Sequence, residues 1–289
     1  MKFSIITPSF RNSAWLKLCI ASIADQSGVS FEHIVQDSCS DDDTKNWLPN
    51  ETRAKVFIEK DSGMYDAVNR GFRRTQGDIL AYLNCDEQYL PGALKKVGDF
   101  FDANPNVEVV FSDTIVTDAG GNYICHRPSL VPGKASMWGR FPILTCAVFI
   151  RRSVIHERGI FFDTQWRDLG DFWWIRELVL RGVRMAVMPE LTSIFADTGD
   201  NMNLKPNALR ERAEKWDVTP RWIKLLHPYW VVQCRARLAL RTATRRPPFD
   251  YSIYTMASPA RRAVFHATHP TTFWKGRLKL NPLAATPGK

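Results

Sequence analysis

A short apolar segment that ends in a polar cluster constrains the fold of this 289-residue chain most. The segment covers residues 79–83, with the sequence ILAYL, and Asn84-Cys85-Asp86-Glu87 follows it directly. An apolar run of this length, bounded by polar residues, is typical of a strand buried on both faces of a parallel sheet. Open α/β sheets bind their ligands beyond the carboxyl ends of such strands. The pattern therefore predicts an α/β fold with a binding site beside Asp86.

Strand-like and helix-like segments alternate along the first 200 residues. Apolar runs predict further strands at residues 3–7, 31–36, 55–59, 107–111, 144–150 and 184–188. Helical spacing of apolar residues predicts helices at residues 15–23, 64–75, 91–103 and 170–181, with Pro91 in the first turn of the third. Turn-forming residues predict a hairpin loop at 118–122 and another loop at 198–201. Alternating strands and helices predict a doubly wound, mostly parallel sheet.

Positive charge is concentrated in the last third of the chain. Residues 205–289 contain 17 Lys and Arg but only 4 Asp and Glu, whereas residues 1–204 contain 22 and 26. The basic segment also carries aromatic residues, namely Trp222, Tyr229, Trp230 and Trp274. This composition fits a solvated helical face and a surface resting on an anionic membrane equally well. It fits nucleic acid less well, so no nucleic-acid partner is expected.

Several classes of protein are disfavoured by the sequence. The longest apolar stretch, residues 143–150, is far shorter than the roughly 20 residues that span a bilayer. The chain starts directly with a predicted strand, without the pattern of a signal peptide. Its six cysteines form no CxxC pairs, which predicts reduced thiols and neither a zinc site nor a disulfide framework. We therefore expect a cytoplasmic protein that can rest on the inner face of a membrane.

Four motifs together resemble one enzyme family. They are residues 5–12 (IITPSFRN), the strand end at Asp37, residues 61–71 (DSGMYDAVNRG) and the cluster that contains Asp86. Over about residues 1–200 the chain is similar to family-2 inverting glycosyltransferases with the GT-A fold, and residues 61–71 are similar to colanic-acid and related polysaccharide transferases. The resemblance implies a nucleotide-sugar-binding half at 1–113 and an acceptor-side half at 114–204. The pattern and charge of residues 205–289 predict a basic helical extension.

The resemblance also implies contacts with a nucleotide-sugar donor. It assigns these contacts to Thr7, Pro8, Ser9, Arg11, Asp37, Asp61, Asn69, Arg70, Asn84 and Cys85. Relatives have glycines where this chain has Ser38 and Asp43 after the second strand, so the path of that loop differs. The helix that begins near Gly63 would direct its free N–H groups at a diphosphate or the base. The alternative is that Asp61 only caps this helix and Arg70 is solvated.

The metal ligand and the general base are implied by the same resemblance. The family has Asp-x-Asp after the fourth strand; here Asn84 replaces the first carboxylate, and Asp86 is the expected ligand of Mn²⁺ or Mg²⁺. Glu87 is a further candidate, and a plain polar turn is the alternative. Asp171 is the expected general base because an inverting transferase needs one carboxylate to deprotonate the acceptor. Asp168 as base, or Asp171 as a mere helix cap, are the alternatives.

We therefore expect a metal-dependent inverting glycosyltransferase that moves a sugar from a nucleotide sugar, most readily a UDP-sugar, to a saccharide or lipid-linked acceptor. Such a reaction belongs to the assembly of polysaccharide, lipopolysaccharide or glycolipid. One alternative is a nucleotidyltransferase, although residues 7–12 lack the Gly-rich, Lys-bearing phosphate loop expected of one. The other is a non-catalytic protein that binds sugar nucleotides, which Asn84 keeps open.

Overall fold

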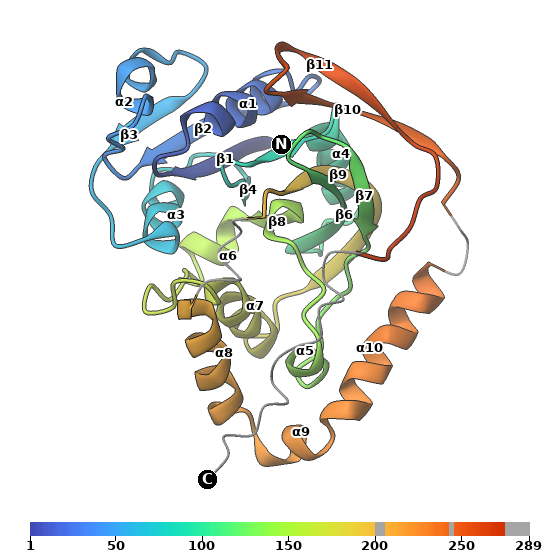
Figure 1. The fold of residues 1–289 in the computed structure, drawn as a ribbon. Helices are drawn as coiled ribbons and strands as arrows, with labels where there is room; N and C mark the ends of the chain where they lie inside the picture. Colours follow the sequence, from blue (N-terminus) through green and yellow to red (C-terminus); the bar gives the residue numbers. More distant parts are fainter. Residues whose placement is uncertain (200–205, 243–245, 275–289) are drawn as a thin grey trace.

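The first half of the fold is a parallel sheet with helical crossovers. The computed structural model describes residues 1–199, 206–242 and 246–274 (Figure 1), so Asp200 and Asn201 of the predicted loop at 198–201 lie outside the described residues. The strands of this half are β1 (Lys2–Ser9), β2 (Ser30–Asp37), β3 (Lys55–Ile58) and β4 (Ile79–Tyr82). The helices are α1 (Ser13–Ala24), α2 (Thr44–Trp47) and α3 (Met64–Arg73), with a 3-10 turn at Leu48–Asn50. β1 pairs in parallel with β2 and β4, and β2 with β3, as predicted.

The second half continues the sheet with mixed pairing. It contains β5 (Glu87–Tyr89), α4 (Ala93–Ala103), β6 (Val109–Asp118), β7 (Tyr123–Arg127), α5 (Ser136–Gly139), β8 (Val148–Arg151), α6 (Arg152–His156), α7 (Gly170–Leu180) and β9 (Met185–Asp197). The strand order is β3-β2-β1-β4-β8-β6-β9-β5, and β7 pairs with β6. Because β8 is antiparallel to both β4 and β6, β6 and β9 run in the same direction as β1 to β4. The sheet is mostly parallel, as predicted.

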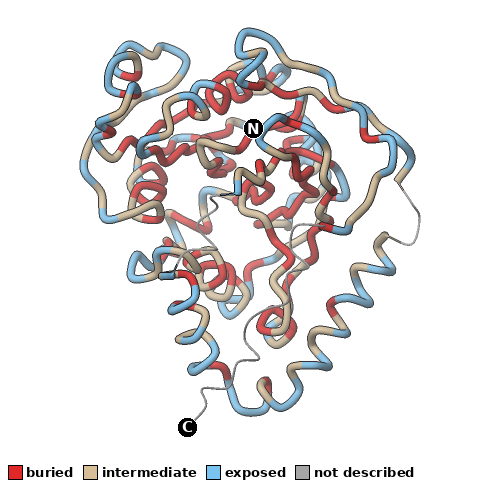
Figure 2. The backbone as a smooth tube through the Cα atoms, in the orientation of Figure 1, coloured by how far each residue is buried: buried red, intermediate tan, exposed pale blue. Residues whose placement is uncertain are grey.

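Helices cover both faces of the sheet. Successive residues of β4 point to opposite faces and pack against the helices on each side. Leu80 and Tyr82 pack on one side with apolar residues of α3, α6 and α7. Ile79 and Ala81 pack on the other side with α1 and α4. Gly71 lets α3 lie close to β1, because a Cβ there would be 2.4 Å from Cγ2 of Ile6. Figure 2 shows that buried residues gather in the sheet and in the helices that cover it.

Three predicted boundaries differ from the structure. The helix predicted to start at Pro91 starts at Ala93, because Gly92 adopts a left-handed conformation with φ 69° that is incompatible with the helix. The strand predicted at 144–150 begins only at Val148, after a 3-10 turn at Thr145–Ala147. The last predicted strand is longer, since β9 continues to Asp197 and pairs with β5 and β6.

The C-terminal third is only partly helical. Helices α8 (Pro206–Val218), α9 (Arg221–Leu225) and α10 (His227–Arg241) confirm the helical part. The expectation is wrong for residues 249–267, which form the antiparallel hairpin β10 (Phe249–Thr255) and β11 (Ser258–Ala267). The cause is a period of two, since Tyr251, Ile253 and Thr255 are buried. The predicted boundary between residues 204 and 205 stays a prediction.

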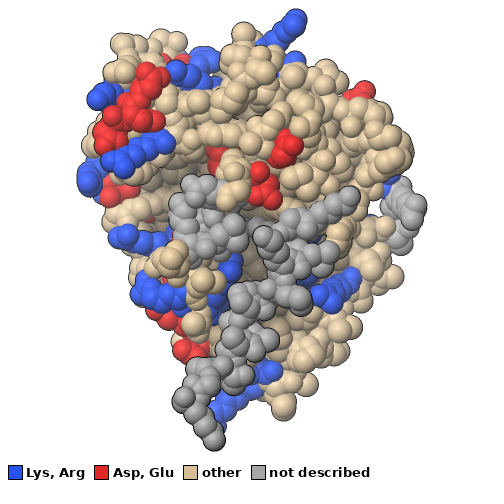
Figure 3. Space-filling model, in the orientation of Figure 1, with Lys and Arg blue, Asp and Glu red and all other residues tan. Residues whose placement is uncertain are grey.

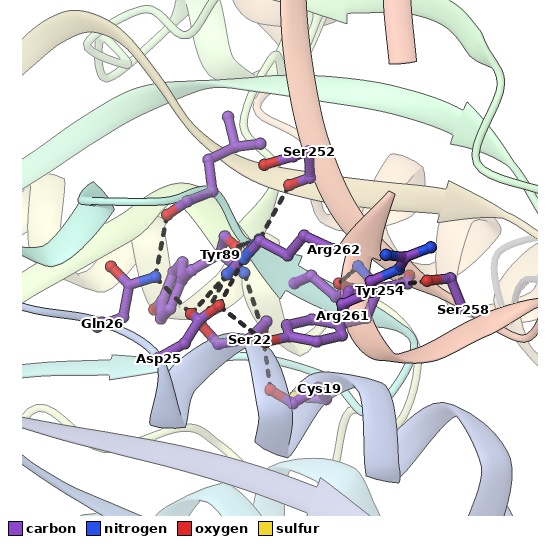
Figure 4. Close-up of polar contacts among 12 residues, drawn as sticks. Cys19, Ser22, Asp25, Gln26, Tyr89, Ser252, Tyr254, Ser258, Arg261 and Arg262 are labelled. Carbon is purple, nitrogen blue, oxygen red and sulfur yellow. Dashed lines mark hydrogen bonds and ion pairs between the residues drawn. The ribbon is translucent and has the colours of Figure 1, made fainter. Parts of the chain in front are cut away.

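One arginine attaches this hairpin to the first half of the fold. Arg262 of β11 donates to both carboxylate oxygens of Asp25, at 2.6 and 2.7 Å (Figure 4). It also donates to the backbone carbonyl groups of Ser22, Tyr89 and Ser252. Hydrogen bonds to charged groups are stronger than neutral ones. The hairpin is therefore held against α1 and β5.

Candidate active site

The loop after β1 uses most of its polar groups within the protein. Thr7 is fully buried, and its hydroxyl lies 2.9 Å from Nε2 of His33 on the neighbouring strand β2. Pro8 is buried within β1. The guanidinium of Arg11 forms an exposed ion pair with Asp41, at 2.5 Å. The expectation that the hydroxyl of Thr7 faces a nucleotide is thus not supported, whereas Ser9 has a buried hydroxyl with no hydrogen-bond partner among the described residues.

Asp37 stabilises the loop that follows β2. Its carboxylate accepts hydrogen bonds from the backbone N–H of Ser40, at 2.8 Å, and from the Ser40 hydroxyl, at 2.7 Å. The loop turns at Cys39, which takes a left-handed conformation with φ 55° without being glycine. The carboxylates of Asp42 and Asp43 then accept hydrogen bonds from Ser13 at the start of α1. In this structure, Asp37 therefore organises its own loop; a contact with a base or ribose stays a prediction.

The turn into α3 is closed by two carboxylates. Asp61 accepts a hydrogen bond from the backbone N–H of Gly63, at 2.9 Å, and Gly63 has a φ of 135° that favours glycine. Asp66 accepts one from Ser62 and pairs with Arg70, at 3.0 Å. Burial raises the pKa of Asp61. Asp61 thus holds the turn before α3 without capping the helix, whose N-cap is Gly63, and Arg70 is paired with Asp66 and Glu59. A contact of Asp61 or Arg70 with the nucleotide stays a prediction.

Asn69 is a structural residue. Its side-chain amide donates to the carbonyl of Phe162, at 2.9 Å, and accepts from the N–H of the same residue, at 3.0 Å. The side chain is buried. Both hydrogen-bonding groups of the amide are used inside the protein, so the expected direct contact between Asn69 and a nucleotide is not supported.

Two neighbouring carboxylates, Asp86 and Glu87, follow β4. Glu87 is buried and accepts a hydrogen bond from the backbone N–H of Asn84, at 2.8 Å. Burial, with the charge of Asp86, raises the pKa of Glu87 to about 8. Burial also raises the pKa of the half-buried Asp86. The thiol of Cys85 accepts a hydrogen bond from Asn12, at 3.1 Å, and burial raises its pKa to about 12, so it is a neutral group.

This pair fits a divalent cation that is shared with a substrate. The pKa values of both neighbouring carboxylates are raised, and a bound cation would favour their ionised form. Within the described ranges, no group of three or more His, Cys, Asp and Glu side chains gathers as a metal site. A cation at Asp86 would therefore need further ligands from water and from phosphate oxygens, as Mg²⁺ usually does.

Asp171 lies in the first turn of α7 and is positioned by α3. Its backbone N–H donates to the hydroxyl of Tyr65, at 3.1 Å, and its carboxylate accepts from the N–H of Phe172, at 2.7 Å. Gly170 makes room for this contact, because a Cβ there would be 2.4 Å from the Tyr65 ring. Burial raises the pKa of Asp171 to about 6. A carboxylate with such a pKa is suited to take up a proton near neutral pH.

Helix α8 holds the loop before Asp171. The buried carboxylate of Glu211 accepts three backbone hydrogen bonds, from Arg167, Asp168 and Leu169, at 2.8 to 3.0 Å. Asn207 donates to the carboxylate of Asp168, at 2.6 Å, and to Glu211, at 2.9 Å. Asp168 is thus engaged by α8, which makes it a weaker candidate for the base than Asp171.

Lys215 of α8 influences the pKa of the candidate base Asp171. Its ammonium lies 3.7 Å from the centre of the Phe172 ring, next to Asp171 in sequence. Burial lowers the pKa of Lys215 to about 8, while its charge lowers that of Asp171. The sequence analysis did not identify Tyr65, Glu211 or Lys215, because their partners are far away in sequence.

The candidate base and the carboxylate pair share one neighbourhood. Tyr82, the last residue of β4, is buried, which raises its pKa; the charges of Asp171 and Glu87 raise it further. Burial also raises the pKa of Tyr65, and the charge of Asp171 raises it further. Tyr65, which accepts the hydrogen bond from the Asp171 N–H, and Tyr82 both pack against the ring of Phe162, with ring centroids 4.9 and 5.6 Å apart. Asp171 therefore lies near the carboxyl end of β4, which Asp86 and Glu87 follow. Arg11 and Arg70, by contrast, are held by ion pairs at the ends of other elements.

Two curated relatives match part of the chain. The PGL/p-HBAD biosynthesis glycosyltransferase of Mycobacterium bovis is 33% identical over 120 residues, which are 39% of this chain and 47% of that protein. The GalNAc(5)-diNAcBac-PP-undecaprenol beta-1,3-glucosyltransferase of Campylobacter jejuni is 30% identical over 125 residues, 41% of this chain and 40% of that protein. The chain spans about half the length of these relatives or less.

Solved structures share the fold. S. aureus TarS 1–349 in complex with UDP-GlcNAc has a TM-score of 0.56 and 16% identity, and the match covers 68% of this chain and 59% of that one. The mannosyltransferase PcManGT from Pyrobaculum calidifontis, in complex with GDP-Man and Mn²⁺, has a TM-score of 0.55 and 16% identity, covering 84% and 76%. At this identity the likeness concerns the fold alone, and it confirms the expected GT-A type.

The family is shown by its sequence profile. The profile described as glycosyl transferase family 2 matches residues 4–159, which is more than half of the chain. The matched region contains β1 to β4 and the carboxylate pair at Asp86 and Glu87. The chain therefore belongs to glycosyl transferase family 2.

Proposed function

We propose that the chain is a metal-dependent inverting glycosyltransferase that transfers a sugar from a nucleotide sugar to a saccharide or lipid-linked acceptor. The observation that carries this proposal is the half-buried carboxylate of Asp171, which the contacts of Tyr65 and Tyr82 with Phe162 place near the strand end that precedes Asp86 and Glu87; burial raises the pKa of Asp171 to about 6. The product would belong to a polysaccharide, lipopolysaccharide or glycolipid.

The donor half is assigned to the ends of β1, β2 and β4 with the turn into α3. Ser9, Asp37, Asp61 and Arg70 would contact the nucleotide, and Asn84 can donate to or accept from a ribose hydroxyl. UDP is our first choice of nucleotide. The fold neighbours support a nucleotide sugar as the donor class, since one is in complex with UDP-GlcNAc and another with GDP-Man and Mn²⁺.

The reaction follows from the two carboxylate positions. Asp86, with Glu87 beside it, would hold Mn²⁺ or Mg²⁺, which supplies positive charge to the departing diphosphate. Asp171 accepts the proton of the acceptor hydroxyl while that oxygen attacks the anomeric carbon from the side opposite the nucleotide. The bond to the new oxygen forms as the bond to the diphosphate breaks, so the configuration at the carbon inverts. Tyr65 and Glu211 hold the Asp171 segment in place during this step.

The acceptor is proposed to be lipid-linked or presented near lipid. The Campylobacter jejuni relative has a name that includes a PP-undecaprenol acceptor. The basic C-terminal third adds peripheral contact with an anionic membrane to the proposal. Among the described residues, no helix is long and apolar enough to cross a membrane.

A donor screen tests this proposal. Nucleotide sugars are incubated with the protein, with and without Mn²⁺, while thermal stabilisation and release of the nucleoside diphosphate are measured. We expect one sugar nucleotide to stabilise the protein only with metal and to be turned over with release of its diphosphate. A parallel incubation contains a nucleoside triphosphate and a sugar 1-phosphate, and release of pyrophosphate there would indicate a nucleotidyltransferase. Donor binding without turnover, in the presence of any mixture of acceptors, would indicate a non-catalytic protein.

A further inference from the structure

The helices α9 and α10 expose an unusual amount of apolar surface. We name this surface the α9–α10 face; it consists of Trp222, Leu225, Tyr229, Val232, Ala236 and Leu240. Leu225, Val232 and Leu240 are 81%, 62% and 79% exposed, and Trp222 and Tyr229 are more than half exposed. Figure 2 shows that exposed and intermediate residues predominate along both helices. Such a run of exposed large apolar side chains is typical of an interaction surface.

The exposed residues lie on one side of α10. Tyr229, Val232, Ala236 and Leu240 are spaced by three, four and four residues, which places them on a single helix face. The opposite side packs on α5, where a Cβ on Gly139 would be 2.7 Å from Cβ of Trp230. Cys234 on this inner side is buried. Helix α10 therefore presents apolar side chains both to the protein and to the solvent.

Positive charge surrounds this apolar face. Four basic residues of α9 and α10 lie around it, namely Arg221, Lys224, Arg235 and Arg237. The sequence contains no Asp or Glu from 218 to 249. Figure 3 shows Lys and Arg side chains at the lower end of the molecule, where α8 to α10 lie. Exposed aromatic and aliphatic side chains bordered by basic ones fit the interface of an anionic bilayer.

We propose that the α9–α10 face binds an anionic membrane surface and that the active site takes its acceptor from that surface. The second half of this inference rests on the proposed function. A second copy of the chain fits this face poorly, because pairing two such faces would bring the same basic residues together without any carboxylate between them. A phospholipid surface supplies both negative headgroups and an apolar layer.

Helix α8 sets the distance between the membrane and the chemistry. Its first turns hold the loop before Asp171 through Asn207 and Glu211, and its last residue, Val218, lies next to α9. From Asn207 to Val218 the helix is about 17 Å long. Figure 1 shows α9 at the tip of the molecule that is furthest from the sheet. The acceptor would therefore be a lipid-linked saccharide whose reactive hydroxyl stands on the order of 20 Å above the headgroups.

Vesicle binding tests this inference. The whole protein is mixed with vesicles of phosphatidylglycerol and phosphatidylcholine, or of phosphatidylcholine alone, and the bound fraction is measured by co-sedimentation. We expect binding to the anionic vesicles that decreases steeply with salt. The double variant Leu225→Asp/Val232→Asp should bind about tenfold or more weakly, because two side chains lose their burial in the lipid interface. The matched control is Val264→Asp, which changes an equally exposed residue on β11, 71% exposed, and should bind like the wild type.

Each alternative outcome is distinguishable. Equal binding to neutral vesicles, no binding by the wild type, or unchanged binding of the double variant would overturn the inference. So would a dimer that forms without lipid and is dispersed by Leu225→Asp, because the face would then join two copies of the chain. Metal-dependent donor binding is measured on all variants and should be unchanged, which shows that they are folded. Failure of the proposed function would appear separately, as vesicle binding without any sugar transfer.

Discussion

The donor half of the molecule and its C-terminal third contribute to the site in different ways. In residues 1–113, β2 ends at Asp37 and β4 is followed by Asp86, so the sheet itself positions these two candidate site residues. In residues 206–242, by contrast, Glu211 and Lys215 act on Asp171 from a separate helix. The candidate donor side is thus built by local sequence, whereas the candidate base depends on Glu211 and Lys215, which lie outside the region matched by the family profile.

The largest effect is expected at the donor side. Asp86→Ala should abolish metal-dependent donor binding and nearly all transfer, because the diphosphate charge is then left uncompensated. Calorimetry with Mn²⁺ and the nucleotide measures the binding. The control is Asp41→Ala, whose carboxylate is exposed and pairs with Arg11. Unchanged Mn²⁺-dependent affinity in Asp86→Ala would remove that residue from the metal site.

A large effect of a different kind is expected at the base. Asp171→Asn should keep nucleotide affinity and lower turnover by about 10²-fold or more, since a general base acts only in the chemical step. Binding and single-turnover rates are measured on the same preparation, next to Asp168→Asn. If Asp171→Asn transfers sugar at nearly the wild-type rate while Asp168→Asn does not, the roles of the two residues are reversed.

A smaller effect is expected from α8. Glu211→Gln removes the charge that accepts three backbone hydrogen bonds, so it should lower the free energy of unfolding by about 1–3 kcal/mol. Glu211 is a positioning residue, so the substitution should also lower kcat about tenfold at unchanged donor affinity, because a small misplacement of the base lowers the rate of the chemical step. Glu214→Gln on the same helix, an exposed partner of Arg210, is the control. Equal loss of stability and kcat in both variants would contradict this role.

Local sequence patterns predicted the strands and helices that carry the candidate residues Asp86 and Asp171, whose roles stay predictions. Their apolar runs and helix spacing are local patterns, and the structure confirms β1 to β4, α3 and α7. The prediction of helix fails at β10 and β11, because buried and more exposed residues alternate along β10 with a period of two, whereas a helix repeats every 3.6 residues. The contacts of Tyr65 with Asp171 and of Glu211 with residues 167–169 join residues 42 to 106 positions apart. The hydrogen bonds of Asn69 with the backbone of Phe162 could not be predicted for the same reason, since the two residues are distant in sequence.

We expect the C-terminal third to tune the candidate base Asp171, and the pH profile of kcat/KM is the measurement that shows this. The charge of Lys215 lowers the pKa of Asp171, which burial raises to about 6. The active form is the deprotonated carboxylate, so activity should fall as the pH drops through about 6. Lys215→Met removes the positive charge, which raises the pKa of Asp171 and moves this acidic limb to higher pH. The exposed control Lys134→Met should leave the limb in place. An acidic limb that is identical in wild type and Lys215→Met would contradict the account.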